Sequence, residues 1–193
     1  MPSTRNYTDL DRQTYSGASN SFGYGRYTVF FVSSGEPKIA IGPQWYMPIL
    51  GMLILGTLGV LALRPLLPMM SGFQVVLYVG FLGVALVLNL LVALSNPGIV
   101  PRPAYPEPLD DREANRQFDC SKCKTTREDR AYHCPDCDAC IREHDHHCFW
   151  LGKCIGRDNL KVFYAFSAAV PSFFIYVLFV TSMHQYTRRQ PGI

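Results

Sequence analysis

Residues 120–154 read CSKCKTTREDRAYHCPDCDACIREHDHHCFWLGKC and hold all seven cysteines of the 193-residue chain. An odd number of cysteines would leave one thiol over in any set of disulfides. The composition is otherwise average, with 48% hydrophobic residues, 17% charged residues and a net charge of +3. This charge is too weak to indicate a nucleic-acid-binding protein.

Charged residues are absent from three long segments outside this stretch. Residues 39–63, 65–101 and 162–183 carry none over 25, 37 and 22 positions. Roughly 20 apolar residues in a helix cross the hydrocarbon core of a bilayer. We therefore expect an α-helical polytopic membrane protein with spans at about 45–63, 73–94 and 162–183. The alternative of three buried helices in a soluble protein fails, because a chain this short cannot enclose three such segments in polar structure.

Lysine and arginine are distributed unevenly around these spans. Four precede the first span, eleven lie between the second and third, one lies between the first two, and two follow the third. Cytoplasmic loops carry an excess of positive charge. The N-terminus and residues 95–161 are therefore expected in the cytosol, with residues 64–72 and the C-terminus lumenal or extracellular. No sorting signal distinguishes the Golgi, the ER and the plasma membrane.

The remaining segments are predicted from their composition. Residues 1–44 are rich in serine, threonine, tyrosine and glycine, which indicates a cytosolic tail that is mostly mobile, with a candidate strand at residues 27–32. Residues 95–119 begin with Ser95-Asn96-Pro97-Gly98 and contain further prolines, so we expect a turn off the membrane and then a stiff linker. Residues 120–161 are expected to form a small irregular Cys-rich domain, and residues 184–193 a short lumenal tail.

The cysteine pattern of residues 120–154 indicates metal ions. The reducing cytosol disfavours disulfides, and structural zinc takes four thiolate or imidazole ligands in a tetrahedron. The cysteines and the interleaved histidines are enough for two zinc sites, which would staple a segment too polar to build much core. If each site takes three cysteines and one histidine, one of the seven cysteines remains.

Cys148 is the best candidate for the remaining thiol. It follows Asp145-His146-His147, so an acid, a base and a thiol lie within four residues, and an adjacent imidazole raises the thiolate fraction. Only 13 residues separate it from the third span. This position favours a nucleophile at the membrane surface and acyl transfer from a thioester. In the alternative, Cys148 is a zinc ligand and another cysteine is idle; the spacing alone leaves both interpretations open.

Basic residues in the same stretch would attract an anionic acyl carrier such as coenzyme A. Alternatively, they form a solvated face beside anionic lipid. These residues are Lys122, Lys124, Arg127, Arg130 and Lys153.

The tetrapeptide Asp145-His146-His147-Cys148 resembles the signature of the DHHC-type protein S-acyltransferases, the protein palmitoyltransferases. The resemblance extends to the other cysteines, to Trp150, Ile155-Gly156, Asn159 and Phe163, and to residues 95–98, which resemble an Asp-Pro-Gly motif. It implies that Cys148 takes an acyl group from an acyl-CoA such as palmitoyl-CoA and passes it to a cysteine of a membrane-associated protein. His146 would be the base and Asp145 would orient it.

The resemblance also implies ligands and contacts. One structural zinc would be held by Cys120, Cys123, His133 and Cys140, and the other by Cys134, Cys137, His147 and Cys154. The acyl chain would lie between the spans, and acyl-CoA would contact Arg127, Arg130, Trp150 and Phe163.

The sequence departs from the family pattern in three respects. The basic motif Arg127-Glu128-Asp129-Arg130 lacks the usual proline, and Asn96 replaces an aspartate, which would weaken a helix-end contact. The family has four spans and this sequence has three, so it is a fragment or a short variant in which a partner subunit replaces the fourth helix. The alternatives are a non-catalytic zinc-stapled membrane scaffold and a RING-like ubiquitin ligase, whose ligand spacing needs longer loops.

Overall fold

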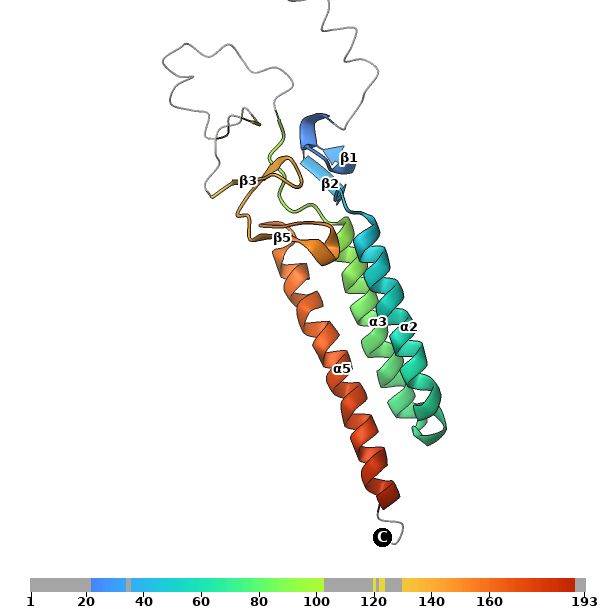
Figure 1. The fold of residues 1–193 in the computed structure, drawn as a ribbon. Helices are drawn as coiled ribbons and strands as arrows, with labels where there is room; N and C mark the ends of the chain where they lie inside the picture. Colours follow the sequence, from blue (N-terminus) through green and yellow to red (C-terminus); the bar gives the residue numbers. More distant parts are fainter. Residues whose placement is uncertain (1–21, 34–35, 103–119, 121, 124–129, 190–193) are drawn as a thin grey trace, which may run out of the picture.

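The computed structural model describes residues 22–33, 36–102, 120, 122–123 and 130–189. Three long helices run side by side, and short β-hairpins gather at one end of them (Figure 1). The helices are α2 (Tyr46–Leu66), which continues into the 3₁₀ turn η2 (Leu67–Met69), α3 (Gly72–Leu94) and α5 (Leu160–Arg189).

The three helices coincide with the charge-free segments, and each is long and apolar enough to cross a membrane. At 1.5 Å per residue, α3 is about 35 Å long, against a hydrocarbon core of about 30 Å. Large apolar side chains such as Leu53, Phe73 and Ile175 are exposed on the outer faces of the helices, as expected for surfaces that contact lipid. The predicted polytopic α-helical fold class is therefore confirmed. Residues 184–189 extend α5 where the sequence predicts a tail, because no proline or glycine occurs between His184 and Pro191.

Helix α3 packs between α2 and α5 through tyrosine side chains. The Tyr78 hydroxyl donates a hydrogen bond to the Gly59 carbonyl on α2 (2.8 Å). From α5, the Tyr176 hydroxyl donates to the Gln74 carbonyl on α3 (2.8 Å). The rings of Tyr78 and Phe173 meet edge to face with their centroids 5.2 Å apart. Each polar hydroxyl is thus satisfied inside the bundle, which hydrocarbon surroundings require.

An antiparallel hairpin lies within the segment for which the sequence predicts a mobile tail. Strand β1 (Thr28–Ser33) pairs with β2 (Glu36–Ile41). Val29 and Ala40 face the Cys-rich domain and are buried with Tyr27, whose hydroxyl accepts a hydrogen bond from the Cys154 N–H (3.1 Å). Strand β1 corresponds to the candidate strand at residues 27–32. The sequence does not predict strand β2, because few of its side chains are buried and their partners are distant in the sequence.

The Cys-rich domain consists of two more hairpins. In the first, β3 (Tyr132–Cys134) pairs with β4 (Ala139–Ile141). In the second, β5 (His146–Cys148) pairs with β6 (Lys153–Ile155), and the 3₁₀ turn η3 (Phe149–Leu151) joins them. Their buried core consists largely of cysteines and small apolar residues. This agrees with the expected small irregular domain.

Asn96 holds the turn that follows α3. Its Oδ1 accepts hydrogen bonds from the N–H groups of Gly98 (3.0 Å) and Ile99 (3.1 Å), and its Nδ2 donates to the Pro37 carbonyl of β2 (3.0 Å). An aspartate could not make the last bond, because it has no Nδ2 donor. The asparagine therefore adds a link to β2 where the sequence predicts a weakened contact. Residues 103–119 of the predicted linker lie outside the described residues.

Candidate metal centres and reactive thiol

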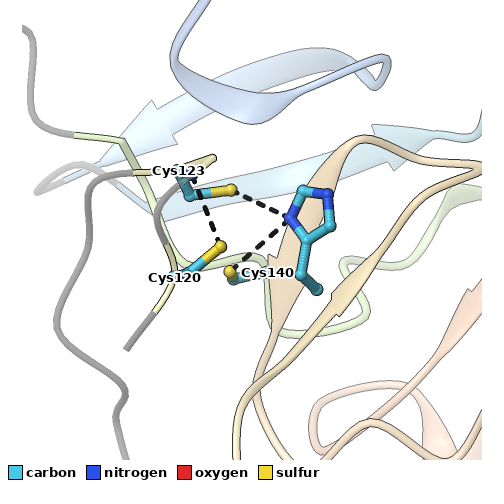
Figure 2. A group of neighbouring side chains, drawn as sticks. Cys120, Cys123 and Cys140 are labelled. Atoms are coloured by element: carbon cyan, nitrogen blue, oxygen red, sulfur yellow. Dashed lines mark hydrogen bonds between the residues drawn. The ribbon is translucent and has the colours of Figure 1, made fainter. Parts of the chain in front are cut away.

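The first group of metal-ligating side chains joins Cys120 and Cys123 to His133 of β3 and Cys140 of β4. Figure 2 shows the three cysteine sulfurs turned toward one another. The Nδ1 of His133 lies 3.2 Å from the Cys123 sulfur and 3.9 Å from the Cys140 sulfur. With Zn–S of about 2.3 Å and Zn–N of about 2.0 Å, tetrahedral ligand atoms lie about 3.5–3.8 Å apart. The donor set and its spacing therefore fit zinc.

The second group contains Cys134, Cys137, His147 and Cys154. The Nδ1 of His147 lies 3.6, 3.4 and 3.7 Å from the sulfurs of Cys134, Cys137 and Cys154, and the last two sulfurs are 3.5 Å apart. These separations also match a tetrahedral zinc site. The two groups have the same membership as the ligand sets that the family resemblance implies.

Strand pairing explains how the two groups are separated. His133 lies directly opposite Cys140 in the β3–β4 hairpin, and His147 lies opposite Cys154 in the β5–β6 hairpin. Because directly opposed residues extend to the same face, each hairpin presents one imidazole and one thiol to one metal. His133 and Cys134 are consecutive on β3 and so point to opposite faces. They consequently enter different groups, and the two groups interlock.

A repeat in the sequence also separates the two groups, although we did not use it to predict them. The spacing C-x2-C-x9-H-x6-C begins at Cys120 and again at Cys134, 14 residues later. A third copy would begin at Cys148. Its other positions carry no thiol or imidazole, since they hold Leu151, Lys161 and Ala168. The repeat therefore leaves Cys148 outside both groups.

The thiols of the second group share protons. Hydrogen bonds from Cys137 and Cys154 hold the pKa of the Cys134 thiol far below its ordinary value. The same hydrogen bond raises the pKa of Cys137 to about 12, and the pKa of Cys154 is raised for the same reason. The raised pKa values of Cys137 and Cys154 favour the thiol form of these two residues. A divalent cation would stabilise all three thiolates, so metal binding is expected to release protons.

Two further side chains support the metal ligands and were not predicted from the sequence. A hydrogen bond from His144 contributes to the lowered pKa of Cys134. The Nε2 of His133 lies 3.6 Å from Asp138, whose carboxylate also forms an ion pair with Arg102 (3.0 Å). Such outer contacts orient metal ligands. They follow from the folded hairpins and have no fixed spacing, so only the structure reveals them.

Cys148 and His147 extend from opposite faces of β5. Side chains alternate along a strand, so His146 and Cys148 point to one side and the metal ligand His147 to the other. The Nδ1 of His146 lies 2.9 Å from the Asp145 carboxylate. This contact leaves Nε2 of His146 as the nitrogen available to accept a proton. The structure thus brings Asp145, His146 and Cys148 together beside the second metal group.

The Cys148 thiol is buried, with 8% of the residue exposed. It lies in an apolar cluster that includes Val92 from the end of α3 and Phe163 from the start of α5. Burial raises the pKa of Cys148, against the opposing effect of hydrogen bonds from the backbone N–H groups of Leu151 and Trp150. The thiol is therefore protonated at neutral pH, and a neighbouring base is needed to form the thiolate nucleophile.

The residues predicted to contact acyl-CoA have different surroundings. Phe163 packs edge to face on His146, with ring centroids 5.2 Å apart. Trp150 is 69% exposed and meets Phe149. Arg130 is exposed, and Arg127 lies outside the described residues. Among the described residues of this set, Phe163 thus contacts His146 through its side chain, and Trp150 contacts Cys148 through its backbone N–H.

The prediction that Lys153 attracts an anionic carrier is wrong. Lys153 has no exposed surface, and its ammonium donates hydrogen bonds to backbone carbonyls. Burial lowers the pKa of Lys153 to about 7, against the opposing electrostatic effect of Cys137 and Cys154. The basic character of a residue does not reveal which side of a short strand it occupies, so the sequence could not separate this lysine from a surface cation.

The segment that carries both metal groups matches a known family. Residues 113–190 match the family model described as DHHC palmitoyltransferase. Comparison with curated proteins gave no match. The matched residues include both ligand groups, Cys148 and helix α5.

Proposed function

We propose that this chain, which belongs to the DHHC palmitoyltransferase family through residues 113–190, is a protein S-acyltransferase with Cys148 as its nucleophile. One observation carries the proposal: a buried thiol outside both metal groups lies on the same side of β5 as an Asp–His pair. It is also packed against the ends of two membrane-spanning helices. A nucleophile in this position can meet a thioester whose acyl chain remains in the hydrocarbon.

The reaction consists of two thioester exchanges. The Nε2 of His146 accepts the proton of Cys148, and the thiolate attacks the carbonyl carbon of acyl-CoA. The bond from the carbonyl carbon to the sulfur of coenzyme A breaks, and the departing thiolate takes up the proton from His146. A cysteine thiolate of a membrane-associated protein then attacks the acyl-Cys148 thioester and releases Cys148. Asp145 fixes the orientation of His146 through both exchanges.

The metal groups have a structural role in this proposal. Bound zinc would supply cross-links between segments that have little apolar core. His147 and Cys154 place one group directly behind the strand that carries Cys148. The ligands thereby hold β5 and β6 in register, while His146 and Cys148 remain on the face turned away from the metal.

Acyl labelling tests the proposal. The full zinc-loaded chain, purified in detergent, is incubated with an alkyne-tagged palmitoyl-CoA, and the covalent label and the zinc content are measured together. We expect one acyl group per chain, released by neutral hydroxylamine because the bond is a thioester. Zinc-loaded protein that never acquires a label would contradict the proposal and favour the non-catalytic scaffold.

Substitution of His146 is expected to make acylation strongly dependent on pH. Because the pKa of Cys148 is raised by burial, little thiolate exists at neutral pH without a base. His146→Ala is expected to slow autoacylation at pH 7 by about 100-fold or more, the usual contribution of a general base. Its residual rate should rise about tenfold per pH unit as hydroxide forms the thiolate, which narrows the difference from the wild type at high pH.

The measurement is the single-turnover labelling rate at several pH values between about 6 and about 9.5. His184→Ala provides the matched control, because His184 lies near the opposite end of α5. Parallel pH profiles for His146→Ala and the wild type would show that His146 is not the base.

A further inference from the structure

Lys153 of β6 is buried, and each donor of its ammonium group has a carbonyl acceptor. Its Nζ donates hydrogen bonds to the carbonyls of Ala40 and Ser95, each at 2.5 Å, and of Ala93 at 3.0 Å. An ammonium has three donors and no acceptor, so three carbonyls satisfy it completely. Such partners are necessary, because removing a charge from water costs several kcal/mol.

The three carbonyls belong to two other elements of the fold. Ala93 lies in the last turn of α3, and Ser95 is the residue that caps it. The final carbonyls of a helix have no intrahelical N–H partner, and they carry the negative end of the helix dipole. Ala40 belongs to β2. The Nζ donors of Lys153 therefore meet the negative end of the α3 dipole, and Lys153 joins both α3 and β2 to β6.

Lys153 also lies directly across the hairpin from Cys148. Directly opposed residues extend to the same face with their Cβ atoms about 5 Å apart. Val92, the residue before Ala93 on α3, belongs to the same buried cluster as Cys148. The Lys153 side chain, which anchors the β5–β6 hairpin to α3, is thus a neighbour of the Cys148 thiol. It is also a neighbour of the last turn of α3, which packs against this thiol.

We propose that Lys153 is a positioning residue that fixes Cys148 against the C-terminal end of α3. Its ammonium holds the β5–β6 hairpin on the carbonyls of Ala93 and Ser95, so that the thiol meets the acyl thioester at one place beside Val92. The effect on acylation rests on the proposed function. The placement of the thiol does not, and it can be measured separately.

The test compares Lys153→Met, which keeps most of the side-chain volume and loses all three hydrogen bonds, with Lys161→Met. Lys161 is an exposed lysine at the start of α5 and serves as the matched control. Three quantities are measured on the full purified chain: zinc content, the rate at which N-ethylmaleimide alkylates Cys148, and the single-turnover labelling rate over a range of palmitoyl-CoA concentrations. Mass spectrometry of the peptide that contains Cys148 assigns the alkylation.

We expect Lys153→Met to retain both zinc ions and to expose Cys148. Two buried carbonyls and one partly buried carbonyl that lose their donor favour an opened hairpin, so alkylation should accelerate by about tenfold. The maximal labelling rate should fall by up to about 100-fold, the effect of misplacing a reacting group by about 1 Å. The palmitoyl-CoA concentration at half-maximal rate should not change, because Lys153 does not contact this substrate. Lys161→Met should match the wild type in all three measurements.

Unchanged alkylation and labelling in Lys153→Met would overturn the proposal. If Lys153→Met loses zinc, Lys153→Gln is used as a second test of the proposal. The glutamine amide keeps a donor, but the side chain is too short to reach all three carbonyls. Faster alkylation of this variant with zinc retained supports positioning, whereas zinc loss from both variants or unchanged alkylation overturns it. If even the wild type never acylates but Lys153→Met is still alkylated faster, the proposed function fails and the positioning role stands.

Discussion

Cys148→Ser is expected to abolish acyl labelling of the chain while the zinc content stays at the wild-type value. A serine hydroxyl is a far weaker acid than a thiol and a poorer nucleophile toward a thioester, so acyl transfer to this position is expected to become very slow. The substitution is nearly isosteric and lies outside both metal groups, so the fold should be preserved. Loss of an activated nucleophile costs several orders of magnitude in rate, which places the expected signal below detection.

The measurement combines in-gel detection of the tagged acyl group with metal analysis of the same sample. Cys137→Ser is the informative comparison, because it also removes one buried cysteine but takes it from the second metal group. That variant should lose zinc and label together, whereas Cys148→Ser should lose only the label. A hydroxylamine-sensitive label that persists in Cys148→Ser would show that another cysteine is the nucleophile.

The helices could be predicted from the sequence because their determinant is local. A charge-free run long enough to cross a bilayer specifies a membrane helix almost without regard to the rest of the chain. The β1–β2 hairpin lacks such a local determinant. Tyr27 and Val29 are buried by contacts with the Cys-rich domain more than 100 residues away. The sequence therefore predicts one candidate strand in a mostly mobile tail, whereas the structure has two paired strands.

The features of the candidate site also differ in whether the local sequence predicts them. Two metal sites can be predicted from residue type and spacing, because thiol and imidazole side chains at fixed intervals have few other uses. The family resemblance implies which residues form each group. Neither residue type nor spacing predicts the buried position of Lys153, since its partners are backbone carbonyls on α3 and β2. Every residue has a backbone carbonyl, so the sequence does not show which carbonyls accept a hydrogen bond from a side chain. The same limit applies to His144, whose contact with Cys134 depends on how two hairpins fold together.

Loss of one ligand of the second metal group is expected to unfold the hairpin that carries Cys148. Cys154 is fully buried and pairs with His147 across β5–β6. Cys154→Ser would leave a hydroxyl among two thiols and an imidazole, and the site would bind zinc far more weakly. Structural zinc contributes about 10 kcal/mol or more to folding, which is comparable to the whole stability of a small domain. The variant should therefore lose zinc, acyl labelling and resistance to proteolysis between β3 and β6.

The matched variant is Cys123→Ser in the first metal group. Cys154→Ser and Cys123→Ser should differ in how much acylation activity they lose. Cys123 and Cys120 are tied to the β3–β4 hairpin, whereas Cys154 and His147 lie on the strands that hold the nucleophile. Each variant is expected to lose one zinc ion, but Cys154→Ser should lose acylation completely, and Cys123→Ser should retain a measurable rate. Metal analysis, limited proteolysis and labelling of both proteins test this order. Equal loss of acylation would mean that the interlocked groups fold as one unit, because His133 and Cys134 are adjacent on the same strand.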